Sequence, residues 1–454
     1  MTELKTTSEL GSEKIGKLLI KYAIPSIAAM LASSLYNIVD RAFIGKGVDA
    51  LALSGLAVTL PLMNLSAAVG SLVGIGSSTM ISIKLGQNDN RNAQIIFGNS
   101  VTLNTIIGIV FGLIFLIFLN PILTLFGATA ATIEYARSYM AIILIGNVFT
   151  HLYFGLNCIL RSTGHPRSAM IATISTVFLN TFLDYLFIIV FHWGIQGAAI
   201  ATILSQVLAL IWQLYKLSDK KELIHLQRGI FRLNPELDRR MLTIGLSPCL
   251  MNAASCLVVL LINRKLLQYG GDYAIGAYSI VNSFLFVMVM IVMGFNQAMQ
   301  PIAGYNWGAG LHDRVLKVLK ITILLGTIVT TGIFLVTQFA TIPCIRVFTN
   351  DPRLTEIAAE GMHLVFIMAP LVGFQMVTGN FFQSIGLPGK SILMSLSRQL
   401  LILVPCLIII PNYLGIKGVW ISMPISDGLS IILASILLIN QIRKINRSLD
   451  PQKK

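Results

Sequence analysis

The stretch YLFIIVFHWGIQGAAIATILSQVLALIWQLY, residues 185–215, contains no Asp, Glu, Lys or Arg. Two longer runs, residues 92–133 and 273–312, share this feature. A transmembrane helix needs about 20 apolar residues to cross about 30 Å of hydrocarbon, so each run can supply one or two spans. Because lipid offers no hydrogen bonds to the backbone, only helices or closed barrels can cross it.

Helices are favoured over barrel strands by the pattern inside these runs. Residues 106–119 are apolar on every side, whereas a barrel strand alternates polar and apolar residues over about 10 positions. Of the 454 residues, 55% are apolar and only 11% are charged, against about 25% charged in soluble domains. The sequence therefore predicts an all-α polytopic membrane protein. Residues 1–21 are polar and amphipathic, so we expect no cleavable signal there.

The apolar segments predict twelve transmembrane helices. They are expected at residues 15–44, 52–84, 92–119, 132–160, 166–191, 195–216, 239–268, 273–306, 314–339, 354–382, 388–411 and 417–440. An even number of spans places both termini on one side, and that side holds 25 of the 33 Lys and Arg residues. Since positive residues stay cytoplasmic, both termini are expected in the cytoplasm of a bacterial cell with the chain in its inner membrane. The net charge of +14 is then a sign of topology and of lipid contact, not of nucleic-acid binding.

Four segments of the first half recur in the second half at an offset of 221 to 223 residues. The pairs are Arg161–Pro166 with Gln383–Pro388, Trp193–Gly197 with Leu414–Gly418, Ala52–Val58 with Ala274–Ile280, and Pro25 with Pro248. The sequence thus predicts two pseudo-symmetric six-helix bundles, residues 1–216 and 239–454, joined by a cytoplasmic linker at 217–238. Such a duplication is typical of secondary transporters that work by alternating access.

Two spans of the first half each present a carboxylate and an amide on one face. Asp184 is the only acid in the fifth and sixth spans, and Asn180 lies one turn before it. Asp40 lies near the outer end of the first span, with Asn37 and Tyr36 three and four residues earlier. An ionisable group inside a span is costly and therefore indicates a functional site.

A second interpretation of the same acids is structural. Asp40 can cap a helix end beside Arg41, and Asp184 can be a hydrogen-bonded packing residue. Under that interpretation neither carboxyl group takes part in transport.

Paired carboxylates would suit exchange of one cation for another. Two that face one cavity cannot both ionise cheaply in a low dielectric. A protonated pair holds a cation weakly, while an ionised pair attracts an organic cation or Na⁺, so binding of drug and proton becomes mutually exclusive. Oxygens of Asn157, Asn180 and Thr202 can complete a shell for a hard cation or bond a protonated acid. The coupling ion therefore stays open between H⁺ and Na⁺, with candidate Na⁺ ligands Asp40, Asn180, Asp184 and Thr202.

The chain resembles the multidrug and toxic compound extrusion (MATE) family. The resemblance rests on the twelve spans, on Tyr36–Gly45 (YNIVDRAFIG), on Asn180–Asp184 (NTFLD), and on the paired Ser-x-Gly-x-Pro loops at Ser162–Pro166 and Ser384–Pro388. It covers nearly the whole chain and is closest to the bacterial branch with DinF-like and MepA-like pumps. It implies a V-shaped pair of bundles that exports cationic drugs and dyes against inward H⁺ or Na⁺ flow.

The resemblance also implies a working cluster in the N-terminal bundle. The matching residues are Asp40, Tyr139, Asn157, Asn180, Asp184 and Thr202. Some relatives couple through acids in the seventh and eighth helices, but here residues 252–257 read NAASCL and the eighth helix has no acid after Asp272. Asp427 and Arg398, in the last two helices, remain candidate functional partners. A structural ion pair, or an Arg398 that faces the cytoplasm, is the other interpretation.

Pro25 in the first span is a candidate hinge, because proline removes an intrahelical hydrogen bond and kinks a helix. A static kink is the other interpretation of the same residue.

Two other functions compete with a monomeric multidrug exporter. One is a flippase of lipid-linked precursors, although such proteins usually carry fourteen spans. The other is a membrane-embedded enzyme, but the sequence has no His-Glu-x-x-His, Gly-x-Ser-x-Gly or phosphate-loop motif, which these chemistries use. We therefore expect no catalytic residue and no cofactor other than the coupling ion.

Overall fold

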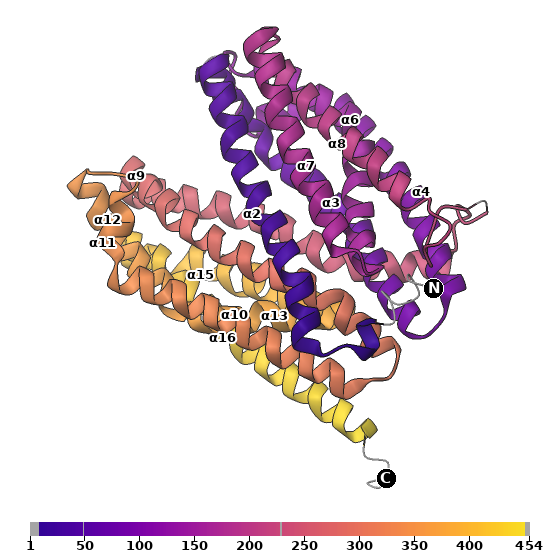
Figure 1. Cartoon of the computed structure of the whole chain (residues 1–454). Coiled ribbons are helices and arrows are strands. Elements are labelled where there is room, and N and C mark those ends of the chain that lie inside the picture. The colour runs from indigo at the N-terminus through magenta and orange to yellow at the C-terminus, as the bar shows by residue number, and fades with distance from the viewer. Residues whose placement is uncertain (1–8, 49, 228, 450–454) are drawn as a thin grey trace. The chain divides into compact units, whose positions relative to one another are not determined.

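The computed structural model describes residues 9–48, 50–227 and 229–449. Some side chains in its helices lie outside the description, namely those of Asn37, Ile38, Arg41, Ala42, Lys46, Ala50, Ser448 and Leu449. All regular secondary structure within the described ranges is helical (Figure 1).

The first half of the chain holds the helices that build the candidate site. They are α2 Ile15–Gly47, α3 Ala50–Gly86, α4 Asn90–Ile117, α5 Leu119–Leu125, α6 Ile133–Ser162, α7 Pro166–Asp184, the π-helix η1 Tyr185–Val190 and α8 Gly194–Lys216.

The second half begins with the longest element, α9 Pro235–Gly308. The elements after it are α10 His312–Phe339, α11 Thr341–Arg346, α12 Pro352–Val365, η2 Phe366–Met368, α13 Ala369–Ser384, α14 Pro388–Leu396, the π-helix η3 Ser397–Leu403, α15 Val404–Ile409 and α16 Pro411–Leu449.

The prediction of twelve spans is confirmed within the described residues. Eleven helices are long and apolar enough to cross a membrane, and one of them is the 74-residue α9. Gly271 interrupts α9 with φ 62° and ψ −158°, a conformation that is essentially restricted to glycine. The element is therefore two consecutive helices, one on either side of Gly271, where the sequence predicted a break.

The duplication is visible in the backbone as well as in the motifs. Left-handed residues recur at the predicted offset, in the pairs Asn88 and Gly310, Gly164 and Gly386, and Gly194 and Gly415. The short helices α5 and α11, which the sequence did not predict, begin 222 residues apart. Each of these left-handed residues and short helices in the first half thus has a counterpart in the second half.

The chain divides into two compact units. Unit 1 contains the residues up to Glu13 and Ile24–Cys249, and unit 2 contains Lys14–Ala23 and the chain from Leu250 onward. The segment predicted as a linker packs on unit 1, because Gln94 Nε2 donates to the His225 carbonyl and His165 pairs with Glu222 at 2.8 Å. The exact domain limits stay a prediction.

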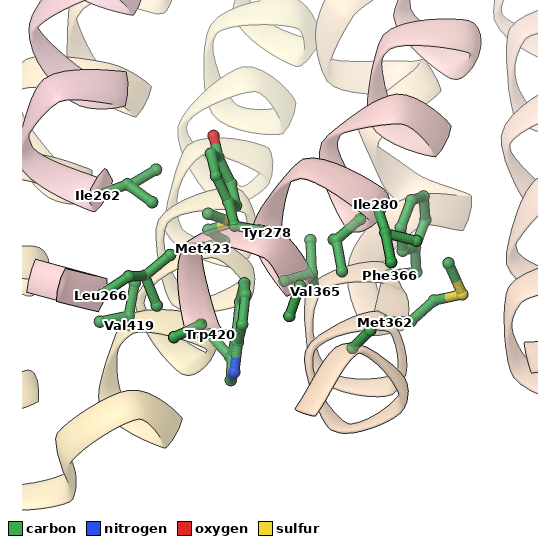
Figure 2. Close-up of a cluster of buried hydrophobic side chains, with 14 of the residues drawn as sticks. Ile262, Leu266, Tyr278, Ile280, Met362, Val365, Phe366, Val419, Trp420 and Met423 are labelled. Atoms are coloured by element: carbon green, nitrogen blue, oxygen red, sulfur yellow. The ribbon is translucent and has the colours of Figure 1, made fainter. Parts of the chain in front are cut away.

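Each unit has a core of its own. In unit 1, α6 packs against α3, α4 and α8, and Tyr139 and Met140 of α6 are fully buried there. In unit 2, Trp420 and Phe366 lie in a cluster of aliphatic and aromatic side chains from α9, α12 and α16 (Figure 2).

Glycines allow very close approach of α3 to the first part of α9 within unit 1. A Cβ atom added at Gly245 would overlap the Leu72 carbonyl oxygen, and one added at Gly76 would overlap the Met241 carbonyl oxygen. Small residues at such crossings permit backbone contact between helices in membranes.

We expect Gly245→Ala to destabilise the protein strongly, because the new methyl group overlaps backbone atoms that cannot move independently. Overpacking of this kind costs about 1–3 kcal/mol or more, which a thermal melt of the detergent-solubilised protein would register as a clear fall in apparent melting temperature. Gly332→Ala is the matched control, since no atom lies within 4 Å of its added Cβ. Equal melting temperatures for both variants would contradict this account of the packing.

Candidate functional site

The two acids singled out in the sequence lie together in unit 1. Asp40 comes from α2 and is 6% exposed, while Asp184, the last residue of α7, is 0% exposed. Their carboxyl groups lie close enough to interact directly. Because two ionised carboxylates repel each other strongly in a low dielectric, this pairing favours a state in which one of them carries a proton.

Asn180 holds Asp184 from one turn earlier on α7. With the amide oriented so that its nitrogen faces the acid, that nitrogen donates to Asp184 Oδ2 at 2.9 Å and the oxygen accepts from the Thr202 backbone N–H at 3.1 Å. This orientation satisfies both neighbours when Asp184 is ionised, and Asn180 then directs a donor at the acid.

Thr202 on α8 joins a tyrosine to this cluster. The Tyr36 hydroxyl lies 3.2 Å from Thr202 Oγ1, while the buried Tyr139 of α6 lies close to the same cluster. Helices α2, α7 and α8 thus each contribute at least one group to a single hydrogen-bonded network.

Small residues on α8 allow α7 and η1 to come close enough for these bonds. A Cβ atom added at Gly197 would lie 3.0 Å from the Phe187 Cβ, and Ala201 packs against Leu183 and Phe187. The π-helix η1 begins directly after Asp184, a widening of the helix that is common at functional sites.

Asn157 is not brought to this cluster. It lies eighteen residues after Tyr139 on α6, a separation of about 27 Å along a helix. Its amide nitrogen donates to the Ala169 carbonyl at 2.9 Å and to Thr173 Oγ1 at 3.2 Å, and its oxygen accepts from Arg161. Asn37, the remaining predicted residue, has a side chain outside the described residues.

A polar cavity of about 200 Å³ adjoins the network inside unit 1. Its lining residues are Ser33, Tyr36, Tyr153, Thr173, Thr176, Val177, Asn180, Thr202, Ser205 and Gln206. It extends from the Asn180 and Thr202 end toward Thr173, the residue that bonds Asn157. Most of this lining was not predicted, although Thr173, Thr176 and Asn180 recur along one face of an otherwise apolar α7.

Arg398 and Asp427 form an ion pair in unit 2. Arg398 Nε donates to Asp427 Oδ1 at 2.7 Å. Both residues belong to the helices in which the sequence placed them.

Comparison with known proteins gives consistent results. The MatE family model matches residues 25–186 and 244–408. The chain is 26% identical to the multidrug export protein MepA of Staphylococcus aureus (strain N315) over 94% of both chains. It is 25% identical to MepA of Staphylococcus haemolyticus (strain JCSC1435) over 93% of both.

Two solved structures show the same fold over nearly the full length. The MATE multidrug transporter DinF-BH, solved in complex with rhodamine 6G, is 35% identical with a TM-score of 0.88, over 95% of this chain and 96% of that one. An outward-facing multidrug resistance MATE family transporter of the MOP superfamily is 22% identical with a TM-score of 0.90, over 97% and 98%.

We expect Thr202→Val to destabilise unit 1, because it removes the hydroxyl group that bonds Tyr36. Leaving a buried hydroxyl group without a partner costs about 1–3 kcal/mol, measurable as a lower apparent melting temperature in detergent. Thr181→Val is the matched control, since the Thr181 hydroxyl bonds only the Val177 carbonyl of its own helix. A melting temperature for Thr202→Val equal to that of the control would contradict a central role for this hydroxyl.

Proposed function

The chain belongs to the MatE family, and we propose that it is a secondary active multidrug exporter that moves organic cations out of the cell in exchange for H⁺. The observation that carries this proposal is the close pairing of the buried carboxyl groups of Asp40 and Asp184. Such a pair would hold one exchangeable proton beside a polar cavity. A charged ligand could replace that proton at the same place.

The exchange mechanism follows from the charge of the pair. With one proton shared, the pair carries one negative charge fewer than when both groups are ionised, and it attracts a cation less. Arrival of an organic cation favours release of the proton, and arrival of a proton favours release of the cation. Antiport requires this mutual exclusion, and it is a reciprocal property of the two ligands.

The donor set favours H⁺ over Na⁺ as the coupling ion. Na⁺ is a hard cation that prefers a shell of oxygen ligands, and Asp40, Asn180, Asp184 and Thr202 are the candidate ligands. Asn180, however, directs its N–H and not its oxygen at Asp184. That arrangement suits a partly ionised acid that shares a proton, and Na⁺ binding would require the amide to turn around.

The substrate class follows from the cavity and from the relatives. Drug-sized ligands occupy pockets of about 300–1,000 Å³, so a cavity of about 200 Å³ admits only the charged end of a dye. Tyr36 and Tyr153 line it, and aromatic faces attract organic cations. DinF-BH was solved with rhodamine 6G and two relatives are named multidrug export proteins, which supports organic cations as cargo.

We place the exporter in the bacterial inner membrane as a monomer in contact with lipid, with both termini cytoplasmic. The asymmetry of Lys and Arg among the loops supports this orientation. Export of cations from the cytoplasm then requires that the carboxyl pair become accessible to each side in turn, by alternating access.

Pro25 is the proposed hinge for that motion. It lies inside α2, which continues as a helix through it. The division between the two compact units falls between Ala23 and Ile24, directly before Pro25. Because proline has no backbone N–H, α2 lacks one intrahelical hydrogen bond at the point where the chain passes from one unit to the other.

Efflux from reconstituted vesicles tests the function. We expect ethidium efflux driven by a proton gradient and not by a sodium gradient, and a rate at least about tenfold lower in Asp184→Asn, in line with the loss of an essential general acid–base group. Asp272→Asn, the same change at an exposed acid, is the control and should transport normally.

Three results would contradict the proposal. Efflux driven only by sodium would overturn the choice of coupling ion, and normal efflux by Asp184→Asn would overturn the site. Absence of dye movement under either gradient would favour the second candidate, a flippase of lipid-linked precursors.

We expect Pro25→Ala to slow transport several-fold without weakening dye binding, because a straightened α2 resists the conformational change but leaves the cavity intact. Rates in vesicles and dye affinity in detergent measure the two effects separately. Pro61→Ala, at a proline inside α3 within unit 1, is the control. Unchanged transport by Pro25→Ala would remove the hinge from the mechanism.

A further inference from the structure

Unit 2 contains an ion pair deep within two membrane spans. Arg398 lies ten residues into the 22-residue span Pro388–Ile409, about 15 Å along the helix. Asp427 lies twelve residues after the break at Gly415 in α16. Charged side chains at such depth face the bundle interior or a water-filled cavity, and they commonly indicate a path for ions or substrates.

Asp427 lies on the face of α16 that points into the bundle. Trp420, Met423, Asp427 and Ser430 follow one another at helical spacing and so share a face. Trp420 and Met423 pack in the core of unit 2, as Figure 2 shows. The Asp427 side chain is accordingly only 11% exposed.

The guanidinium of Arg398 is held at one edge and open at the other. Its Nε donates to Asp427 Oδ1 at 2.7 Å, and its backbone carbonyl accepts from Ser426 Oγ at 2.5 Å. Its two terminal amino groups have no hydrogen-bond acceptor among the residues described, and its side chain is 27% exposed. That open edge is the part of arginine that binds a carboxylate through two parallel hydrogen bonds.

Two more polar atoms nearby in the fold lack partners within the described chain. Gln399 donates through Nε2 to Ser255 Oγ at 2.8 Å, but its buried Oε1 accepts no bond. The hydroxyl of Ser430, one turn after Asp427 and 0% exposed, is also without a partner. Native proteins rarely leave buried polar atoms unsatisfied, so these atoms are available to bond a polar ligand.

The duplication places this cluster where unit 1 has its cavity. Arg398 corresponds to Thr176 at the offset of 222 that relates Pro388 to Pro166. Asp427 corresponds to Gln206 at the offset of 221 that relates Gly418 to Gly197. Thr176 and Gln206 both line the polar cavity of unit 1. The π-helix η3, which carries Arg398, adds a local distortion typical of functional sites.

We propose that Arg398, Asp427, Gln399 and Ser430 form a second binding site, in unit 2, for an organic zwitterion that carries a carboxylate. The ligand carboxylate binds the two terminal amino groups of Arg398, while Asp427 stays hydrogen-bonded to its Nε. A second carboxylate alone would leave a net negative charge in a low dielectric. The cationic part of a zwitterion, placed beside Asp427, restores neutrality.

A pair of dyes that differ in one group tests the site by equilibrium binding to the detergent-solubilised full chain. Rhodamine 6G is an ethyl ester and a cation, and its free acid is a zwitterion with the same fluorophore. We expect Arg398→Gln to weaken binding of the free acid about tenfold, as loss of a charge-assisted bond does, and to change rhodamine 6G affinity less than about twofold. Arg264→Gln, at an exposed arginine, is the control.

One further variant separates carboxylate recognition from a structural ion pair. Arg398→Lys keeps the ion pair with Asp427 but loses the two parallel N–H donors of the guanidinium. It should therefore weaken free-acid binding while leaving the melting temperature unchanged.

Equal loss of free-acid and rhodamine 6G binding in Arg398→Gln would overturn the proposal. Unchanged affinity in both Arg398 variants, or no saturable binding of the free acid to the wild type, would do the same. Failure of rhodamine 6G alone to bind would count against the proposed cation exporter and not against this site.

Discussion

The site in unit 1 depends on one constraint, which is that two carboxyl groups share a buried position in a membrane span. Full ionisation of both would place two like charges in a medium that solvates neither. The surrounding residues are arranged to stabilise a single charge: Asn180 donates to Asp184, and Thr202 bonds both Asn180 and Tyr36. A site built this way responds to any cation that arrives, because the proton and the cation neutralise the same charge.

The sequence predicted the membrane fold, the twelve spans and the acids because these signals are local. A run without charge, or an acid within such a run, needs no knowledge of distant contacts. Asn157 was grouped with the acids by residue type, yet the helical rise alone places it about 27 Å from Tyr139 on α6. The π-helices and the short helices α5 and α11 were not predicted, since apolar segments have the same composition in every helix type.

The cavity was harder to predict for a different reason. Serine and threonine can satisfy their hydroxyl groups on their own helix, and Thr173 and Thr176 both do so, at the carbonyls of Ala169 and Ala172. Such residues are therefore compatible with any lipid-facing or buried position. Only the packing of α7 against α8 shows that they line the same space as Asn180 and Gln206.

The two units share the same order of helices but differ in their charged groups, and this difference is why we propose that coupling belongs to unit 1. Asp427 faces a guanidinium that is always charged, so its negative charge is already balanced and gains little from a proton or from a cation alone. Asp184 lies beside Asn180 and another acid, neither of which is a cation. Under this proposal only a proton or a ligand balances its charge, and the choice between them drives the exchange.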